Sequence, residues 1–371
     1  MSTPKTIQCN AFADLPALRA GGIIYLLRTG LDGGLGEYFA SRGFNVEDNL
    51  LTDAALEDYH GVALRRVPSA TRLIVAMGGF AAMEAGKLLA HTAHLPLWCV
   101  PTDYDAVTAL ADYSLWTTNG APLFVPAPEL TVLRLTSVFS ATRDGIQQAY
   151  QHLFGYYVAL EAAIFRNRLF LAEGDNARLR EVLKEVEKAL LSADEYSPTL
   201  GDTLWAGIAQ AAEVCEDREI ILMAKAICVY KKGNMAYNRY VFAAAYAYLA
   251  ALGESKDMPD LLLPPDSALV AKEAADKLGW QVPAPKAMDK KEYRRLDWVW
   301  RDYLGELAQA AQTAKEIAKR WRRIAGSAGY GYFEDLSAED LTYLMPIVAE
   351  TYPTYTPFKH LYLRGGLNLF I

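Results

Sequence analysis

The sequence predicts two domains of different class, an α/β domain followed by an all-helical domain. Between residues 73 and 100, two short apolar runs of strand length enclose a Gly-Gly step and a helical pattern. Strand, turn, helix and strand in this order form a βαβ unit, which joins parallel strands. From Ser137 onward, almost every segment instead has the period of amphipathic helices. We therefore place the domains at residues 1–136 and 137–371.

The other elements of the first domain follow from apolar runs and turn residues. Predicted strands cover 22–28, 44–51, 73–77, 95–100 and 131–135, and predicted helices cover 35–42 and 54–67. Asn119-Gly120, between two apolar runs in residues 113–125, predicts a β-hairpin. Residues 105–112 are a short helix or a loop. Residues 1–20 are a lead-in that packs on another element or on a second subunit.

The second domain is predicted to consist of helices. They cover 141–170 as one helix or two, then 176–192, 204–216, 218–232, 240–252, 268–278 and 289–324, with a last segment from Leu336. Proline-rich and glycine-containing stretches at 259–265, 281–285 and 326–332 separate them, and residues 352–371 form an aromatic tail.

Composition excludes several classes of function. The net charge is −7 and the pI is near 5.4, which argues against a nucleic-acid or anionic-membrane partner, since either calls for a basic face. We expect no transmembrane helix, because no uncharged apolar stretch reaches the required length. The four cysteines lie far apart without a C-x-x-C pair. They predict buried free thiols, and with the lack of a signal-like start they favour a cytoplasmic protein.

Gly78 and Gly79 mark the first candidate site. They follow a predicted strand and open a helix, so backbone N–H groups of a helix N-terminus lie at the carboxyl end of a strand. A phosphate is commonly bound at that place. The alternative is an ordinary glycine turn, which many α/β proteins contain, and the G-x-G-x-x-G fingerprint is absent.

The segment from Gly78 to Lys87 resembles the Gly-Gly-Gly-Ser-x-x-Asp-x-x-Lys turn and helix of the iron-containing alcohol dehydrogenase and dehydroquinate synthase-like superfamily. Leu-Pro-Leu-Trp-Cys-Val-Pro101-Thr102 is similar to the strand and Pro-Thr step that follow in that superfamily. Within the superfamily, the sequence resembles the glycerol dehydrogenases and glycerol-1-phosphate dehydrogenases. Phe80 replaces the third glycine and Glu84 replaces the aspartate.

The resemblance implies a dehydroquinate synthase-like fold, in which a Rossmann-like dinucleotide-binding domain precedes the helical one and the active site lies between them. It implies NAD or NADP as cofactor. The implied cofactor-binding residues are Gly78, Gly79, Phe80, Lys87, Pro101, Thr102 and Asp105.

Members of this superfamily hold zinc or iron with one acidic residue and two histidines of the helical domain. Here Asp144 stands at the acidic position, although an ordinary acid at a helix N-terminus is an equal alternative. Lys225 and Tyr237 stand at the two histidine positions. Residues 153–359 contain no histidine. A histidine-based metal site is therefore excluded unless His152 or His360 contributes, and we expect the metal to be lost.

Lys225 has two interpretations. Its ammonium is a point charge that could pair with Asp144 in place of the metal, as a structural ion pair. Alternatively, Lys225 stabilises an alkoxide while Tyr237 passes a proton, as a metal-free catalytic pair. Because Lys225 lies in the apolar stretch from Ile220 to Val229, its stem is predicted to be buried.

The sequence thus predicts a divergent NAD(P)-dependent dehydrogenase with a degenerate metal site. Its substrate would be a polyol or a polyol phosphate, and the chain a possible homo-oligomer. The alternative is a catalytically inactive member of the superfamily that acts as a binding or assembly protein. The altered metal ligands favour the second hypothesis, and the Gly-Gly turn with the Pro-Thr step favours the first.

Overall fold

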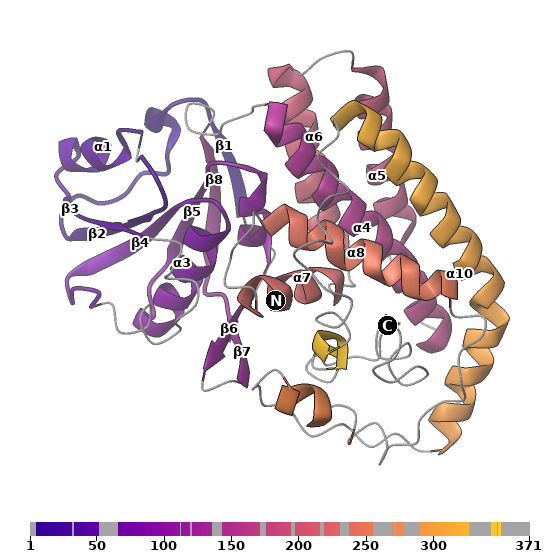
Figure 1. The fold of residues 1–371 in the computed structure, drawn as a ribbon. Helices are drawn as coiled ribbons and strands as arrows, with labels where there is room; N and C mark the ends of the chain where they lie inside the picture. The colour runs from indigo at the N-terminus through magenta and orange to yellow at the C-terminus, as the bar shows by residue number, and fades with distance from the viewer. Residues whose placement is uncertain are drawn as a thin grey trace. The chain divides into compact units, whose positions relative to one another are not determined.

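The structure is a computed structural model of the whole chain (Figure 1). It describes residues 5–31, 33–51, 66–111, 113–118, 121–135, 143–170, 176–193, 197–215, 219–230, 237–254, 269, 272–277, 290–325, 343–346 and 348–349. The chain divides into two compact units. Unit 1 comprises Met1–Thr118, Leu123–Gly145 and Val229–Ala236, and unit 2 comprises Asn119–Pro122, Ile146–Cys228 and Tyr237–Ile371.

Unit 1 is built on a six-stranded parallel sheet in the order β1-β8-β5-β4-β2-β3. Its strands are β1 (Lys5–Cys9), β2 (Ile23–Arg28), β3 (Asn45–Leu50), β4 (Thr71–Gly78), β5 (Leu97–Pro101) and β8 (Leu130–Leu135). Five of them confirm the predicted strands. The sequence interpretation missed β1, which pairs with β8 at the sheet edge. Only Cys9 of β1 is buried, and the strand lacks the apolar run that marks β2, β4 and β5.

The two faces of the sheet are covered by different helices (Figure 1). Alternate strand residues, among them Leu73, Val75 and Trp98, form one apolar core with Phe39 of α1 (Leu35–Ser41). The opposite face carries α3 (Phe80–Ala93), whose Gly86 lies so close to Ala76 that an added Cβ would come within 2.5 Å of the alanine Cβ. This alternation is the period of a strand buried on both faces.

Shorter elements complete unit 1. The predicted hairpin is present as β6 (Tyr113–Thr118) and β7 (Ala121–Pro126), which form a separate two-stranded sheet. Asn119-Gly120 and most of the predicted helix at 54–67 lie outside the described residues. The 3₁₀ helices are η1 (Phe12–Asp14) and η3 (Tyr104–Leu110), and the second of these resolves the choice between helix and loop at 105–112.

The described residues of unit 2 are almost all helical, as predicted. The helices are α4 (Arg143–Phe170), α5 (Asn176–Ser192), α6 (Pro198–Val214), α7 (Glu219–Tyr230), α8 (Tyr237–Glu254) and α10 (Lys290–Ala325). Residues 272–277, 343–346 and 348–349 are also helical. The predicted breaks at 259–265, 281–285 and 326–332 and the tail at 352–371 lie outside the described residues.

The start of α6 differs from the prediction by about two turns. Ser197 is the N-cap: its hydroxyl accepts a hydrogen bond from the amide of Leu200 at 3.1 Å, and Pro198 occupies the first helical position. Ser-Pro is a helix-start signal, because the serine satisfies an end N–H and proline lacks one. The prediction began this helix at Leu204 because it relied on the spacing of apolar residues, and the residues that cap the helix do not follow that spacing.

Glycines allow helices of unit 2 to pack closely against one another. An added Cβ on Gly155 of α4 would meet Val241 of α8 at 2.5 Å, and one on Gly207 of α6 would meet Val186 of α5 at 2.1 Å. The rings of Phe154 and Phe242 pack nearby in a tilted arrangement, with centroids 5.1 Å apart. Among the described residues, no helix has the length and apolar character needed to cross a bilayer.

Candidate functional site

The order in which successive strands are added to the sheet of unit 1 reverses between β2 and β4, which are hydrogen-bonded neighbours. From β2 the chain continues through α1 to β3 on one side, and from β4 it continues through α3 to β5 on the other. Ligands of open parallel sheets bind outside the carboxyl ends of the strands at such a topological switch point. Here that point is formed by Thr29-Gly30 after β2 and Gly78-Gly79 after β4.

Three loops meet at this point. Gly78 has φ +147°, and an added Cβ would lie 2.1 Å from the Thr29 hydroxyl. The Thr29 amide donates to the Met77 carbonyl, and the Thr102 amide donates to the Gly78 carbonyl, each at 3.1 Å. Glycine at position 78 is therefore required both by the backbone conformation and by the contact with Thr29.

Helix α3 begins at this turn with its N-terminus uncapped by a side chain. Gly79 is the N-cap residue, no side chain caps the helix, and no acidic residue lies in its first turn. The first N–H groups of a helix have no partner within the helix and carry the positive end of its dipole. Gly78, Gly79 and the backbone of Phe80 form the turn that begins α3, which we call the cradle, and their role in binding an anionic group stays a prediction.

Two carboxylates follow β5 at the same end of the sheet. Asp105 is buried, and Asp103 is partly buried with one oxygen 3.2 Å from the Ala106 amide, which donates to it. Burial, reinforced by the negative charge of Asp105, raises the pKa of Asp103 to about 7, although hydrogen bonds from the Ala106 and Asp105 amides and from Thr102 oppose this. Asp103 was not among the residues that the sequence singled out for cofactor binding. Its proximity to Gly79 depends on the pairing of β4 with β5.

Lys87 lies two turns into α3 and is fully buried. Its ammonium is 3.5 Å from the Glu84 carboxylate, which is 1% exposed, and it donates to the Tyr113 carbonyl of β6 at 3.4 Å. In this arrangement the Lys87 charge is directed into the protein interior beneath β6. Its predicted role in cofactor binding stays a prediction.

None of the cysteines is placed as a nucleophile. All four are free and buried, as predicted. Burial raises the pKa of Cys99 to about 12; the Lys87 ammonium opposes this shift and Glu84 adds to it. A thiol with such a pKa stays protonated near neutral pH, whereas catalytic cysteines need the thiolate.

In unit 2, a set of polar side chains lies in the helical core. It consists of Gln151, His152, Glu219, Lys225 and Asn238. The predicted burial of Lys225 is confirmed, because its exposed fraction is 0%. Asn238 donates through Nδ2 to the Gln151 side-chain oxygen. The side chain of Asp144 lies outside the described part of the structure, so its pairing with Lys225 stays a prediction.

Tyr237 is buried, and its side chain is hydrogen-bonded within unit 2. Its hydroxyl donates to the Ile221 carbonyl at 3.3 Å, and its ring lies 5.8 Å from the ring of His152. His152, the last histidine before the long histidine-free stretch, therefore lies beside Tyr237, the candidate proton carrier. From the sequence, His152 is considered only as one of two histidines that could still contribute to a metal site.

The donor set around Tyr237 does not fit the metal that the fold family implies. A protonated lysine has no lone pair for a metal, and the Tyr237 hydroxyl is engaged as a donor to a carbonyl. Within the ranges that the structure describes, no three His, Cys, Asp or Glu side chains are grouped to hold an ion. We therefore derive no step through a metal.

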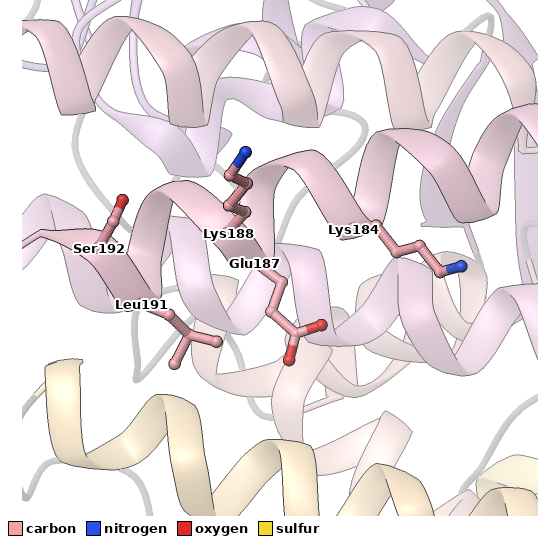
Figure 2. A pocket seen from close by; sticks show the side chains of 5 residues that line it. All are labelled: Lys184, Glu187, Lys188, Leu191 and Ser192. Carbon is pink, nitrogen blue, oxygen red and sulfur yellow. The ribbon is translucent and has the colours of Figure 1, made fainter.

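Two further features of unit 2 have structural explanations. Arg168 forms a bidentate pair with Glu306 at 2.6 and 3.0 Å and stacks over the ring of Tyr303 at 4.1 Å, which ties α4 to α10. Figure 2 shows an open hollow lined by Lys184, Glu187, Lys188, Leu191 and Ser192, all on α5. Among the described residues, one helix supplies the lining side chains, so no convergent set of polar groups marks a ligand site there.

No model of a known protein family matches the chain, and no curated protein sequence matches it significantly. Solved structures do match it. An archaeal alcohol dehydrogenase from a Red Sea brine pool aligns with a TM-score of 0.60 at 12% identity, over 100% of this chain and 97% of that one. Glycerol dehydrogenase from Schizosaccharomyces pombe aligns with a TM-score of 0.51 at 14% identity, over 88% and 93% of the two chains.

A third similar structure is maleylacetate reductase from a Rhizobium species, with a TM-score of 0.50, 14% identity and coverage of 92% and 87%. At these identities the similarity establishes the fold. The resemblance found in the sequence around Gly78 is thereby confirmed at the level of the fold, over nearly the whole chain. The chain has the two-part α/β and helical fold of the iron-containing alcohol dehydrogenases and glycerol dehydrogenases.

Proposed function

We propose that the chain is an NAD(P)-linked oxidoreductase that acts on a polyol or a polyol phosphate, with residues 1–136 holding the dinucleotide and residues 137–371 the helical domain. The observation that carries the proposal is the Gly78-Gly79 turn that begins α3, located at the topological switch point of a parallel sheet. The structural neighbours, which are named as alcohol and glycerol dehydrogenases, support the same class of reaction.

Several of this chain's residues fit a dinucleotide. The Gly78-Gly79 turn would let the backbone approach a pyrophosphate, and the N–H groups that begin α3 would donate to it. Thr102, joined to the Gly78 carbonyl through its amide, would border the same group. The bound dinucleotide would accept or deliver the hydride. The chain's own groups would orient the substrate and carry the proton.

Gly79→Asp is expected to abolish dinucleotide binding, because it adds bulk and negative charge at the phosphate cradle. Isothermal titration calorimetry with NAD⁺, NADH, NADP⁺ and NADPH measures the loss. Gly305→Asp is the matched control: this glycine lies on α10 with nothing within 4 Å of an added Cβ. Circular dichroism of both variants verifies folding. The unmutated protein showing no affinity for any of the four dinucleotides would overturn the proposal.

The purified protein is expected to contain less than one zinc or iron per chain, because lysine and tyrosine replace the nitrogen ligands. Elemental analysis of protein expressed in metal-supplemented medium provides the measurement. One transition metal per chain that survives dialysis against a chelator would show that the ligand assignment is wrong.

A second candidate function is a non-catalytic binding protein. It is favoured by the hydrogen bond that commits the Tyr237 hydroxyl to the Ile221 carbonyl and by the full burial of Lys225. The two functions are separated by incubating the protein with a panel of polyols and polyol phosphates and either oxidised dinucleotide. Formation of NADH or NADPH supports the enzyme, and dinucleotide binding without turnover on any substrate supports the binding protein.

A further inference from the structure

The loop after β5 places a carboxylate directly against the phosphate cradle. A Cβ built on Gly79 would lie 2.8 Å from one oxygen of Asp103 and 3.2 Å from the other. The carboxylate thus faces the residue that begins α3. The same hydrogen bonds that fix the loop, from the Thr102 amide to the Gly78 carbonyl and from the Ala106 amide to Asp103, hold it there.

We propose that Asp103 is an internal competitor for the dinucleotide phosphate, so that its charge state sets the affinity of the site. The inference rests on the proposed dinucleotide-binding function and adds to it a residue that controls the affinity of the site. An ionised Asp103 supplies the negative charge that the N-terminus of α3 attracts and repels a second anion at the same place. A protonated Asp103 leaves that end of the helix to the phosphate and can donate a hydrogen bond to it.

The groups around Asp103 raise its pKa into the neutral range, so that both its neutral and its ionised form are populated near physiological pH. Among the described residues, the charged group that acts on it is Asp105 of η3, while α3 offers the backbone of Gly79 and the loop offers the Thr102 hydroxyl at 3.5 Å. The pKa of Asp103 lies at about 7. Below that pH Asp103 is mostly neutral and does not repel a bound anion. Above it, each bound phosphate requires that Asp103 take up a proton or move away.

The sign of the pH dependence follows from this linkage. If binding requires the neutral carboxyl, the dissociation constant for a dinucleotide rises by up to about tenfold per pH unit above the pKa and is constant below it. NADH is the better probe than NADPH, because the 2′-phosphate of NADPH itself titrates near neutral pH and would add its own dependence.

The test is calorimetric titration of the full-length protein with NADH between about pH 5.5 and pH 8.5, repeated with NADPH. In the unmutated protein, affinity is expected to fall above neutral pH. Asp103→Asn, which keeps the shape without the charge, is expected to remove this dependence and to bind about tenfold more tightly at about pH 8. Asp302→Asn, an exposed acid of α10, is the matched control and should follow the unmutated protein.

Asp105→Asn separates a charge effect from a change of loop structure. Removing the neighbouring charge lowers the pKa of Asp103, so the midpoint of the affinity profile should move to lower pH while the dependence persists. Equal affinity and equal pH dependence in the unmutated protein and Asp103→Asn would overturn the role of Asp103 and leave the proposed function intact. Failure of both proteins to bind either dinucleotide at any pH would overturn both proposals.

Discussion

Lys87→Met is expected to destabilise unit 1 by about 3–5 kcal/mol, the cost of removing one partner from a buried ion pair. The variant takes the ammonium away from the Glu84 carboxylate, which is 1% exposed and 3.5 Å distant, and from the Tyr113 carbonyl. Hydrogen exchange read by mass spectrometry on peptides of α3 and β6 measures this loss in unit 1 separately. Protection there should fall by several orders of magnitude.

The double variant Glu84→Met/Lys87→Met is expected to recover most of this stability, since apolar replacement of a whole buried pair is often neutral or stabilising. Arg301→Met is the control. Its i,i+4 pair with Asp297 on α10 spans 2.9 Å, but the arginine is 66% exposed, so the change should cost well under about 1 kcal/mol. Loss of NADH affinity in a stable double variant would show instead that Lys87 acts on the cofactor. Unchanged hydrogen-exchange protection of α3 and β6 in Lys87→Met would contradict the structural role of Lys87.

Lys225→Met has the largest expected effect on activity if Lys225 is the electrophile. Loss of a preorganised donor to a developing alkoxide lowers turnover by about 10²–10³-fold, while NADH affinity should stay unchanged because the cradle is formed by unit 1. Steady-state rates on the best polyol substrate, with calorimetric affinity measured in parallel, provide the readout. The matched control is Lys184→Met, which changes an exposed lysine of α5 (Figure 2). It should retain both the turnover and the NADH affinity.

If Lys225 instead forms a structural pair with Asp144, the outcome is different. Lys225→Met alone then destabilises the protein, and Lys225→Met/Asp144→Leu restores stability or increases it. Urea unfolding of the single and double variants distinguishes the two roles. A single variant that keeps full turnover and full stability would contradict both roles, because the electrophile predicts a loss of turnover and the ion pair predicts a loss of stability.

Much of the fold could be read from local patterns. Apolar runs bounded by turn residues predicted central strands such as β2, β4 and β5, because strands buried on both faces contain few polar residues. Helical period predicted most of unit 2 in the same way. The misses share one cause: β1 and the first turns of α6 lack a periodic apolar face. Edge pairing with β8 forms β1, and the Ser197 cap begins α6.

The sequence by itself determined the chemistry available at each site: the glycines of the cradle, the acids after β5, and lysine and tyrosine in place of the expected histidines. Only the tertiary structure decided which of them meet. Parallel pairing brings Gly79 beside Asp103 and Gly78 beside Thr29, and helix packing places His152 beside Tyr237. Such contacts join residues far apart in the chain, so they depend on strand order and helix packing, which no local pattern records.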